Sequence, residues 1–95
     1  MRKPFIAGNW KMFKTISEAR AFAEEFKELY RASDVRVAIF APYLQLAALK
    51  EAFCGTYIEV GAQNMHFAEE GAYTGEISAR MLREIGITCC IIGHS

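Results

Sequence analysis

The chain has 95 residues, of which 53% are hydrophobic and 23% charged, a composition that excludes a disordered chain and fits one small domain. Its 11 basic and 11 acidic side chains cancel, so charge gives no case for nucleic acid or a membrane surface as a partner. No apolar run approaches the ~20 residues that a membrane span needs, and we expect a soluble protein.

A strand and an amphipathic helix open the chain. Residues 5–8 form a short apolar run that predicts a strand. Thr15 and Glu18 have the spacing of a capping box, and a helix is predicted over residues 16–30, with Glu24 and Lys27 able to pair on its polar side. Its apolar residues recur at steps of three and four: Ile16, Ala19, Phe22, Ala23, Phe26, Leu29 and Tyr30.

The same alternation of strand and helix continues along the chain. Two further helices are predicted over residues 43–53 and 77–85. Three further strands are predicted over residues 35–40, 57–62 and 88–92. The last helix has apolar residues at helical spacing: Ile77, Met81, Leu82 and Ile85. Such an order favours parallel strands joined by helical crossovers, which is the α/β class.

Polar side chains follow the first and the last predicted strand. In parallel α/β folds ligands bind beyond the carboxyl ends of the strands, where Asn9, Lys11 and His94 fall. If residues 9–11 stay extended, Asn9 and Lys11 project together and Trp10 packs on the other side. An amide, an ammonium and a neutral imidazole suit an anionic or carbonyl-bearing small molecule. Taken singly, the three also fit a turn residue, a surface lysine and a strand-end histidine.

A long irregular segment over residues 66–75 separates the third strand from the third helix. It is longer than ordinary strand-to-helix loops, and its apolar residues Ala72 and Tyr73 suit a loop that contacts a partner.

The cysteines and histidines do not form a metal motif. Cys89, Cys90, His66 and His94 lack the C-x-x-C or H-x-x-x-H spacing of a metal site, and a strand would turn the two adjacent thiols to opposite faces. The odd count of three cysteines, with Cys54, favours free thiols in a reducing compartment, and we expect the cytoplasm.

Four motifs in succession resemble the signatures of the triosephosphate isomerase family. They are FIAGNWKM at residues 5–12, GAQN at 61–64, GAYTGE at 71–76 and IIGHS at 91–95. The resemblance implies that residues 1–95 are the N-terminal part of a single (β/α)8 TIM-barrel domain, with its first four strands and three helices. It also implies interconversion of dihydroxyacetone phosphate and D-glyceraldehyde 3-phosphate through an enediolate, in glycolysis and gluconeogenesis, without cofactor or metal.

The resemblance assigns roles motif by motif. Asn9 and Lys11 match the substrate-binding pair, in which the lysine balances the charges of the phosphate and the enediolate. His94 matches the catalytic electrophile. A homodimer through the 66–75 loop is implied by matches to interface positions: Gln63, Asn64, Tyr73, Thr74 and Glu76.

The resemblance covers about two-fifths of a barrel, since the fold takes about 250 residues. The family's catalytic glutamate, lid and phosphate-binding glycines come after the matching part, so we expect the 95 residues alone to be inactive. Glu59 lies early in its strand and Glu76 matches a structural position, so neither replaces the base. The alternatives are a non-catalytic half-barrel, a scaffold that self-assembles from two chains, and a module that only binds its ligand.

Overall fold

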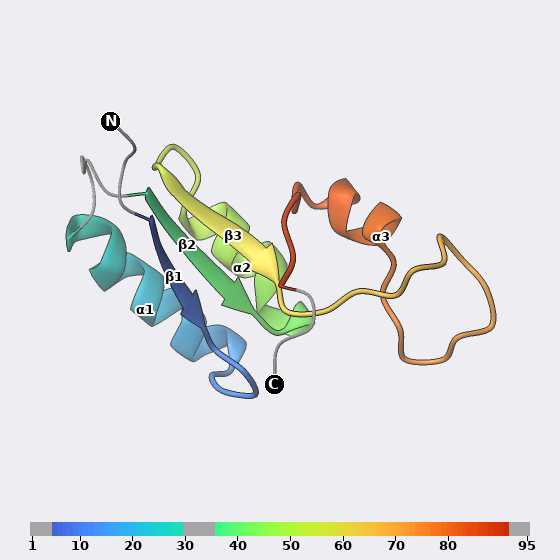
Figure 1. Cartoon of the computed structure of the whole chain (residues 1–95). Coiled ribbons are helices and arrows are strands. Elements are labelled where there is room, and N and C mark those ends of the chain that lie inside the picture. Colours follow the sequence, from blue (N-terminus) through green and yellow to red (C-terminus); the bar gives the residue numbers. More distant parts are fainter. Residues whose placement is uncertain (1–4, 30–35, 92–95) are drawn as a thin grey trace.

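The structure, a computed structural model, describes residues 5–29 and 36–91. Strands and helices alternate as predicted (Figure 1): β1 (Phe5–Asn9), α1 (Ile16–Leu29), β2 (Arg36–Ala41), α2 (Tyr43–Ala52), β3 (Ile58–Ala62) and α3 (Ala79–Glu84). The three strands form a parallel sheet in sequence order, which confirms the α/β prediction. None of the helices in the described ranges has the length and apolar character that crossing a membrane requires.

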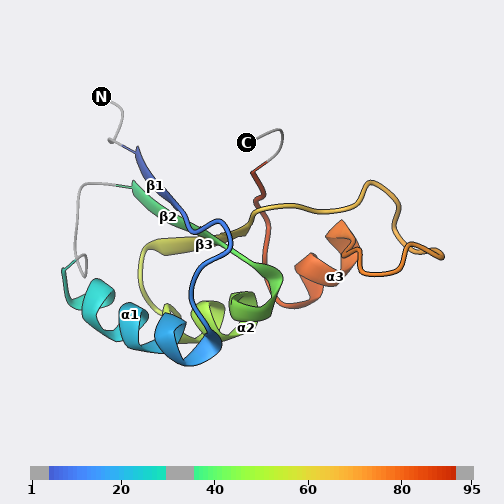
Figure 2. The ribbon, with the colours of Figure 1, turned by 90° about the horizontal axis from the view of Figure 1, so that it is seen from below.

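Helices α1 and α2 cover one face of the sheet (Figure 2). Successive residues of a strand point to opposite faces, so alternate residues of β2 and β3 pack on these helices. The core on this side consists of Ala19, Ala23, Val37, Ile39, Ala41, Leu46, Leu49, Phe53, Ile58, Val60 and Ala62, continued by Leu82 and Ile87. Burial of these apolar side chains holds the helices against the sheet.

The predicted capping box opens α1. The Glu18 N–H donates to Oγ1 of Thr15 at 3.2 Å, and the Thr15 N–H donates to Oε1 of Glu18 at 2.8 Å. The bond from the Thr15 backbone lowers the pKa of the Glu18 carboxyl. The predicted pair of Glu24 and Lys27 is also present, with 3.0 Å between Oε2 and Nζ.

The apolar side of α1 is buried only along its middle. Ala19 and Ala23 are fully buried, but Ile16 is 40% exposed and Leu29 76% exposed. The predicted apolar side is therefore present, but its two ends are exposed, because no described residue of the core packs over them.

Helix α3 begins two residues later than predicted. Ser78 caps it, since its Oγ accepts from the Met81 N–H at 3.3 Å, and Ile77 precedes the cap. Leu82 is buried, but Met81 and Ile85 are exposed, so the predicted apolar side of this helix is only partly covered.

The predicted fourth strand is present as one parallel bridge beside β3, between Ala62 and Cys90. The Ala62 N–H donates to the Cys89 carbonyl at 3.0 Å, and the Ile91 N–H donates to the Ala62 carbonyl at 2.9 Å. Residues 92–95, which include His94, lie outside the described residues.

On the other face of the sheet, the Phe40 ring lies over Gly61. A Cβ at Gly61 would stand 2.5 Å from Cε1 of Phe40 and 2.8 Å from Sγ of Cys89, so only glycine leaves room for them. Cys90 instead packs against the helix-side core, which confirms that the strand separates the two thiols. All three cysteines are free, and burial raises the pKa of Cys89 and of Cys90.

Candidate active site

The carboxyl ends of the strands bring the predicted site residues to one edge of the sheet, the edge where parallel α/β sheets bind ligands. A cavity of about 340 Å³ opens there, lined by Lys11, Met12, Pro42, Tyr43, Gln63 and Asn64. Three predicted residues therefore share one cavity, Lys11, Gln63 and Asn64. Asn9 adjoins it as the last residue of β1.

Lys11 leaves the strand in a left-handed turn. Its φ is 54°, and its N–H donates to Oδ1 of Asn9 at 3.0 Å. The prediction that residues 9–11 stay extended is wrong, because the Asn9 side chain bends the chain in an Asx turn. Lys11 is exposed, and no residue within 5–29 or 36–91 forms an ion pair with its ammonium. Its positive charge is therefore available to an anion.

Two glutamines hold the loop that carries Lys11. Nε2 of Gln63 donates to the Lys11 carbonyl at 2.8 Å, and Nε2 of Gln45 on α2 donates to the carbonyl of Lys14. Neither Gln45 nor Lys14 is among the predicted site residues. One signal was present, because Gln45 lies four residues before Leu49 and so shares the buried side of α2 with it.

Trp10 anchors the start of this loop. Its ring meets the Phe22 ring of α1 edge-on, with centroids 5.2 Å apart, which confirms the prediction that Trp10 packs. Nζ of Lys14 lies 5.6 Å from the centroids of both rings, within the range of a cation–π interaction.

Tyr43, which is not among the predicted site residues, also lines this cavity. Its hydroxyl oxygen is buried and has no hydrogen-bond partner within the described residues. Burial, with a smaller contribution from the Glu76 carboxylate, raises the pKa of the phenol. The phenol therefore stays protonated, and its hydroxyl is enclosed by the protein beside the cavity.

Glu59 is engaged away from this edge, at the start of the sheet. Arg36, the first residue of β2, donates to both of its carboxylate oxygens, from Nε at 2.7 Å and from Nη2 at 3.1 Å. The hydrogen bond from Arg36 lowers the pKa of Glu59, so the carboxylate is a weak base. The predicted place of Glu59 early in its strand, β3 (Ile58–Ala62), is confirmed. Its pairing with Arg36 makes the carboxylate unsuited to abstract a proton.

The segment between β3 and α3 projects away from the sheet (Figure 1). The Tyr73 and Phe67 rings flank His66, with centroids 4.2 Å and 4.5 Å from the imidazole. Phe67 is 86% exposed and Tyr73 48% exposed. The predicted interface residues thus fall in two places, with Tyr73, Thr74 and Glu76 on the projecting segment and the other two at the cavity.

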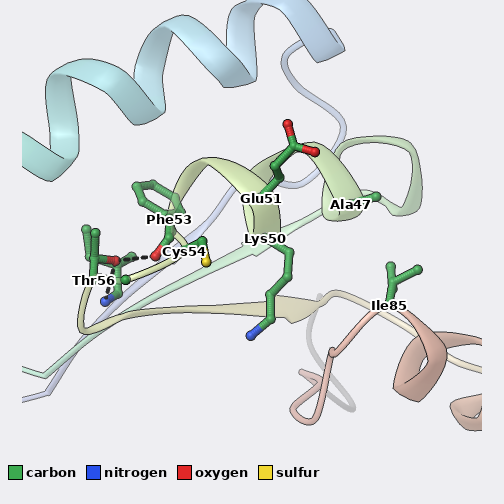
Figure 3. A pocket seen from close by; sticks show the side chains of 9 residues that line it. Ala47, Lys50, Glu51, Phe53, Cys54, Thr56 and Ile85 are labelled. Atoms are coloured by element: carbon green, nitrogen blue, oxygen red, sulfur yellow. Dashed lines mark hydrogen bonds between the residues drawn. The ribbon is translucent and has the colours of Figure 1, made fainter.

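A larger pocket, of about 540 Å³, lies at the opposite edge of the sheet (Figure 3). The residues that line it come from the end of α2, the start of β3 and the end of α3: Ala47, Lys50, Glu51, Phe53, Cys54, Gly55, Thr56, Ile58 and Ile85. In Figure 3 Lys50 and Glu51 point in different directions, so the pocket does not gather charged groups around one ligand position. The Thr56 hydroxyl is engaged, because it donates to the Phe53 carbonyl at 2.7 Å.

Comparison with known proteins points to one family. The family model described as triosephosphate isomerase matches residues 4–95. Similar proteins, each named triosephosphate isomerase, come from Carboxydothermus hydrogenoformans, 54% identical over 96 residues, Clostridium perfringens, 53% over 95, and Alkaliphilus metalliredigens, 48% over 95. In each case the match takes in 100% of this chain and 38% of the relative. The chain thus spans less than half the length of these relatives.

Proposed function

We propose that this chain, which belongs to the triosephosphate isomerase family, supplies part of a site that interconverts dihydroxyacetone phosphate and D-glyceraldehyde 3-phosphate. The observation that carries the proposal is the exposed Lys11 ammonium beside the cavity at the strand ends, without an ion-pair partner in the described part of the chain. The family match supports it. Residues 1–95 then form the N-terminal part of a single barrel domain.

In this reaction a proton leaves the carbon next to the carbonyl and returns to the neighbouring carbon, through an enediolate. The Lys11 ammonium balances the negative charge of the phosphate and of the enediolate oxygens, and it acts most strongly as that charge develops. Asn9 fixes the Lys11 backbone through its side-chain oxygen. His94, as a neutral imidazole, polarises the carbonyl and moves a proton between the two oxygens. No cofactor takes part.

Exchange of Lys11 for methionine tests the proposal in the polypeptide that the gene encodes. Lys11→Met keeps the length of the side chain and removes the charge, and we expect kcat/KM to fall at least about a hundredfold. Lys50→Met is the matched control, because Lys50 lines the pocket at the opposite edge of the sheet. Full activity of Lys11→Met would contradict the proposal.

We also propose that the protein forms a homodimer through residues 66–75 and works in the cytoplasm. The exposed rings of Phe67 and Tyr73 on a projecting segment support a partner surface, and the free cysteines fit a reducing compartment. Thr74→Arg should shift the protein to the monomer in sedimentation, because a charge at the tip opposes burial. A dimer that persists in this variant with unchanged affinity speaks against this interface.

A self-assembling half-barrel is the second candidate. It is favoured by the sheet face turned away from α1 and α2, over which no helix of the described residues packs. Native mass spectrometry separates the candidates. A chain of 95 residues that pairs with itself and does not turn over triose phosphate supports the scaffold, and an active longer polypeptide supports the isomerase.

A further inference from the structure

The loop between β1 and α1 contains both non-glycine residues with positive φ in the described part of the chain. They are Lys11, with φ 54°, and Lys14, with φ 72°. The left-handed region is unfavourable for a side chain with a Cβ, so such residues persist only where their surroundings hold them.

Each of these two lysines has its backbone carbonyl bound by a glutamine from another element. Gln63 follows β3 and donates to the Lys11 carbonyl at 2.8 Å, while Gln45 on α2 donates to the Lys14 carbonyl. The Lys11 N–H is also taken, by Oδ1 of Asn9 at 3.0 Å. Side chains from three neighbouring segments therefore fix the backbone of one loop.

Gln45 is an unusual choice for its position. It is 5% exposed and lies next to Leu46 on the buried side of α2, where an apolar side chain is the common choice. Its amide oxygen is buried without a hydrogen-bond partner within the described residues. A half-satisfied buried amide is unfavourable for folding. Its bond to the loop offers a reason for its presence.

We infer that Gln63 is a positioning residue for Lys11, and that Gln45 holds the other end of the same loop. The inference rests on the proposed function, in which the Lys11 ammonium meets the substrate. Gln63 contacts the Lys11 backbone and not the substrate, so it acts by fixing the position of the Lys11 ammonium. Gln63 also matches an interface position of the family, but a role at an interface does not explain its hydrogen bond to Lys11 of the same chain.

A double-mutant cycle on the complete gene product tests the inference. Gln63→Met keeps the side-chain length but cannot donate a hydrogen bond to the Lys11 carbonyl. We expect the dissociation constant for phosphoglycolate to rise about five- to tenfold, which is the effect typical of losing one hydrogen bond. In the Lys11→Met background the same change should have no further effect on binding, since the group that Gln63 positions is gone. An equal effect in both backgrounds would overturn the inference, because it would mean that Gln63 supports the fold generally.

Gln63→Glu provides the second variant, because it preserves shape and replaces the donor by an acceptor. It should weaken phosphoglycolate binding as Gln63→Met does, while Gln63→Asn, which retains an amide, should recover part of the affinity. Wild-type affinity in the Glu variant would overturn the hydrogen-bond role.

The backbone at residue 11 gives a readout that does not depend on the reaction. The three-bond coupling between its amide and α protons reports φ in NMR spectra, and it should change in Gln63→Met and in Gln45→Met. If the wild-type protein binds no phosphoglycolate but the coupling changes as expected, the proposed function fails and the positioning role stands. An unchanged coupling in both variants would overturn the inference, because it would mean that the loop keeps its shape without the glutamines.

Discussion

Gly61→Ala should destabilise the end of β3 that carries the cavity. A new Cβ would stand 2.5 Å from Cε1 of Phe40, against about 3.4 Å for the nearest ordinary contact, so the ring must retreat about 0.9 Å. Overpacking of this kind costs about 1–3 kcal/mol. Alanine recovers about 0.5–1 kcal/mol because it restricts the unfolded chain. Because the new Cβ would also stand 2.8 Å from Sγ of Cys89, we take the upper part of the first range, about 2–3 kcal/mol, which leaves a net loss of about 1–2.5 kcal/mol.

Urea unfolding of the complete gene product, followed through far-ultraviolet circular dichroism, measures this loss. Phe40→Leu removes the ring that the new methyl group meets. In that background Gly61→Ala should cost much less than in the wild type. The steric reasoning is wrong if Gly61→Ala costs the same in both backgrounds, or if it leaves the unfolding midpoint unchanged.

Three further predictions concern the helix cap, an ion pair and the isolated chain. Thr15→Ala removes the cap of α1 and should lower the free energy of unfolding by about 0.5–2 kcal/mol in urea; no loss would mean that the box is not formed in solution. Because pairing with Arg36 lowers the folded pKa of Glu59, the pair stabilises the fold above the ordinary glutamate value and loses this effect as pH falls through the lowered pKa. The exposed setting of the pair keeps this gain small. Glu59→Gln should flatten the profile of stability against pH below about pH 4.5, and an unchanged profile would exclude the pair. Residues 1–95 expressed alone should show no turnover in a steady-state isomerase assay, and turnover like that of a full barrel would contradict this. They should also aggregate, self-associate or stay partly molten, because β1 has an unpaired edge in the described sheet. A monomer that melts cooperatively would contradict this second expectation.

The regular elements could be predicted because their signals are local. The capping box needs only Thr15 and Glu18 at the right spacing, and Ala19 and Ala23 follow from helical periodicity. The exposed ends of α1 could not be predicted, because periodicity gives the direction of a side chain and not what lies opposite it. Leu29 is on the expected side and still exposed.

Which residues form the candidate site could be predicted better than how they are arranged. The alternation of strand and helix placed Lys11 and Gln63 at the same edge, since parallel strands end together. The turn at Lys11 depends on a hydrogen bond from its own N–H to the Asn9 side chain. The Lys11 carbonyl is bound by Gln63, which is 52 residues away in sequence. No local pattern encodes a contact of that separation. The proposed role of His94 stays a prediction, because that residue lies outside the described part of the chain.

Stability and ligand binding are coupled in the loop after β1, because the same aromatic pair anchors both of its ends. The Trp10 N–H donates to the Phe40 carbonyl at 2.9 Å, so Trp10 continues the ladder of the sheet while its ring packs on Phe22. The Lys14 ammonium lies over the same two rings, and Lys11 stands between these anchors. A change at Phe22 therefore loosens both anchors at once, although Phe22 does not line the cavity. A substitution in this core should for that reason alter the position of the Lys11 charge as well as the free energy of unfolding.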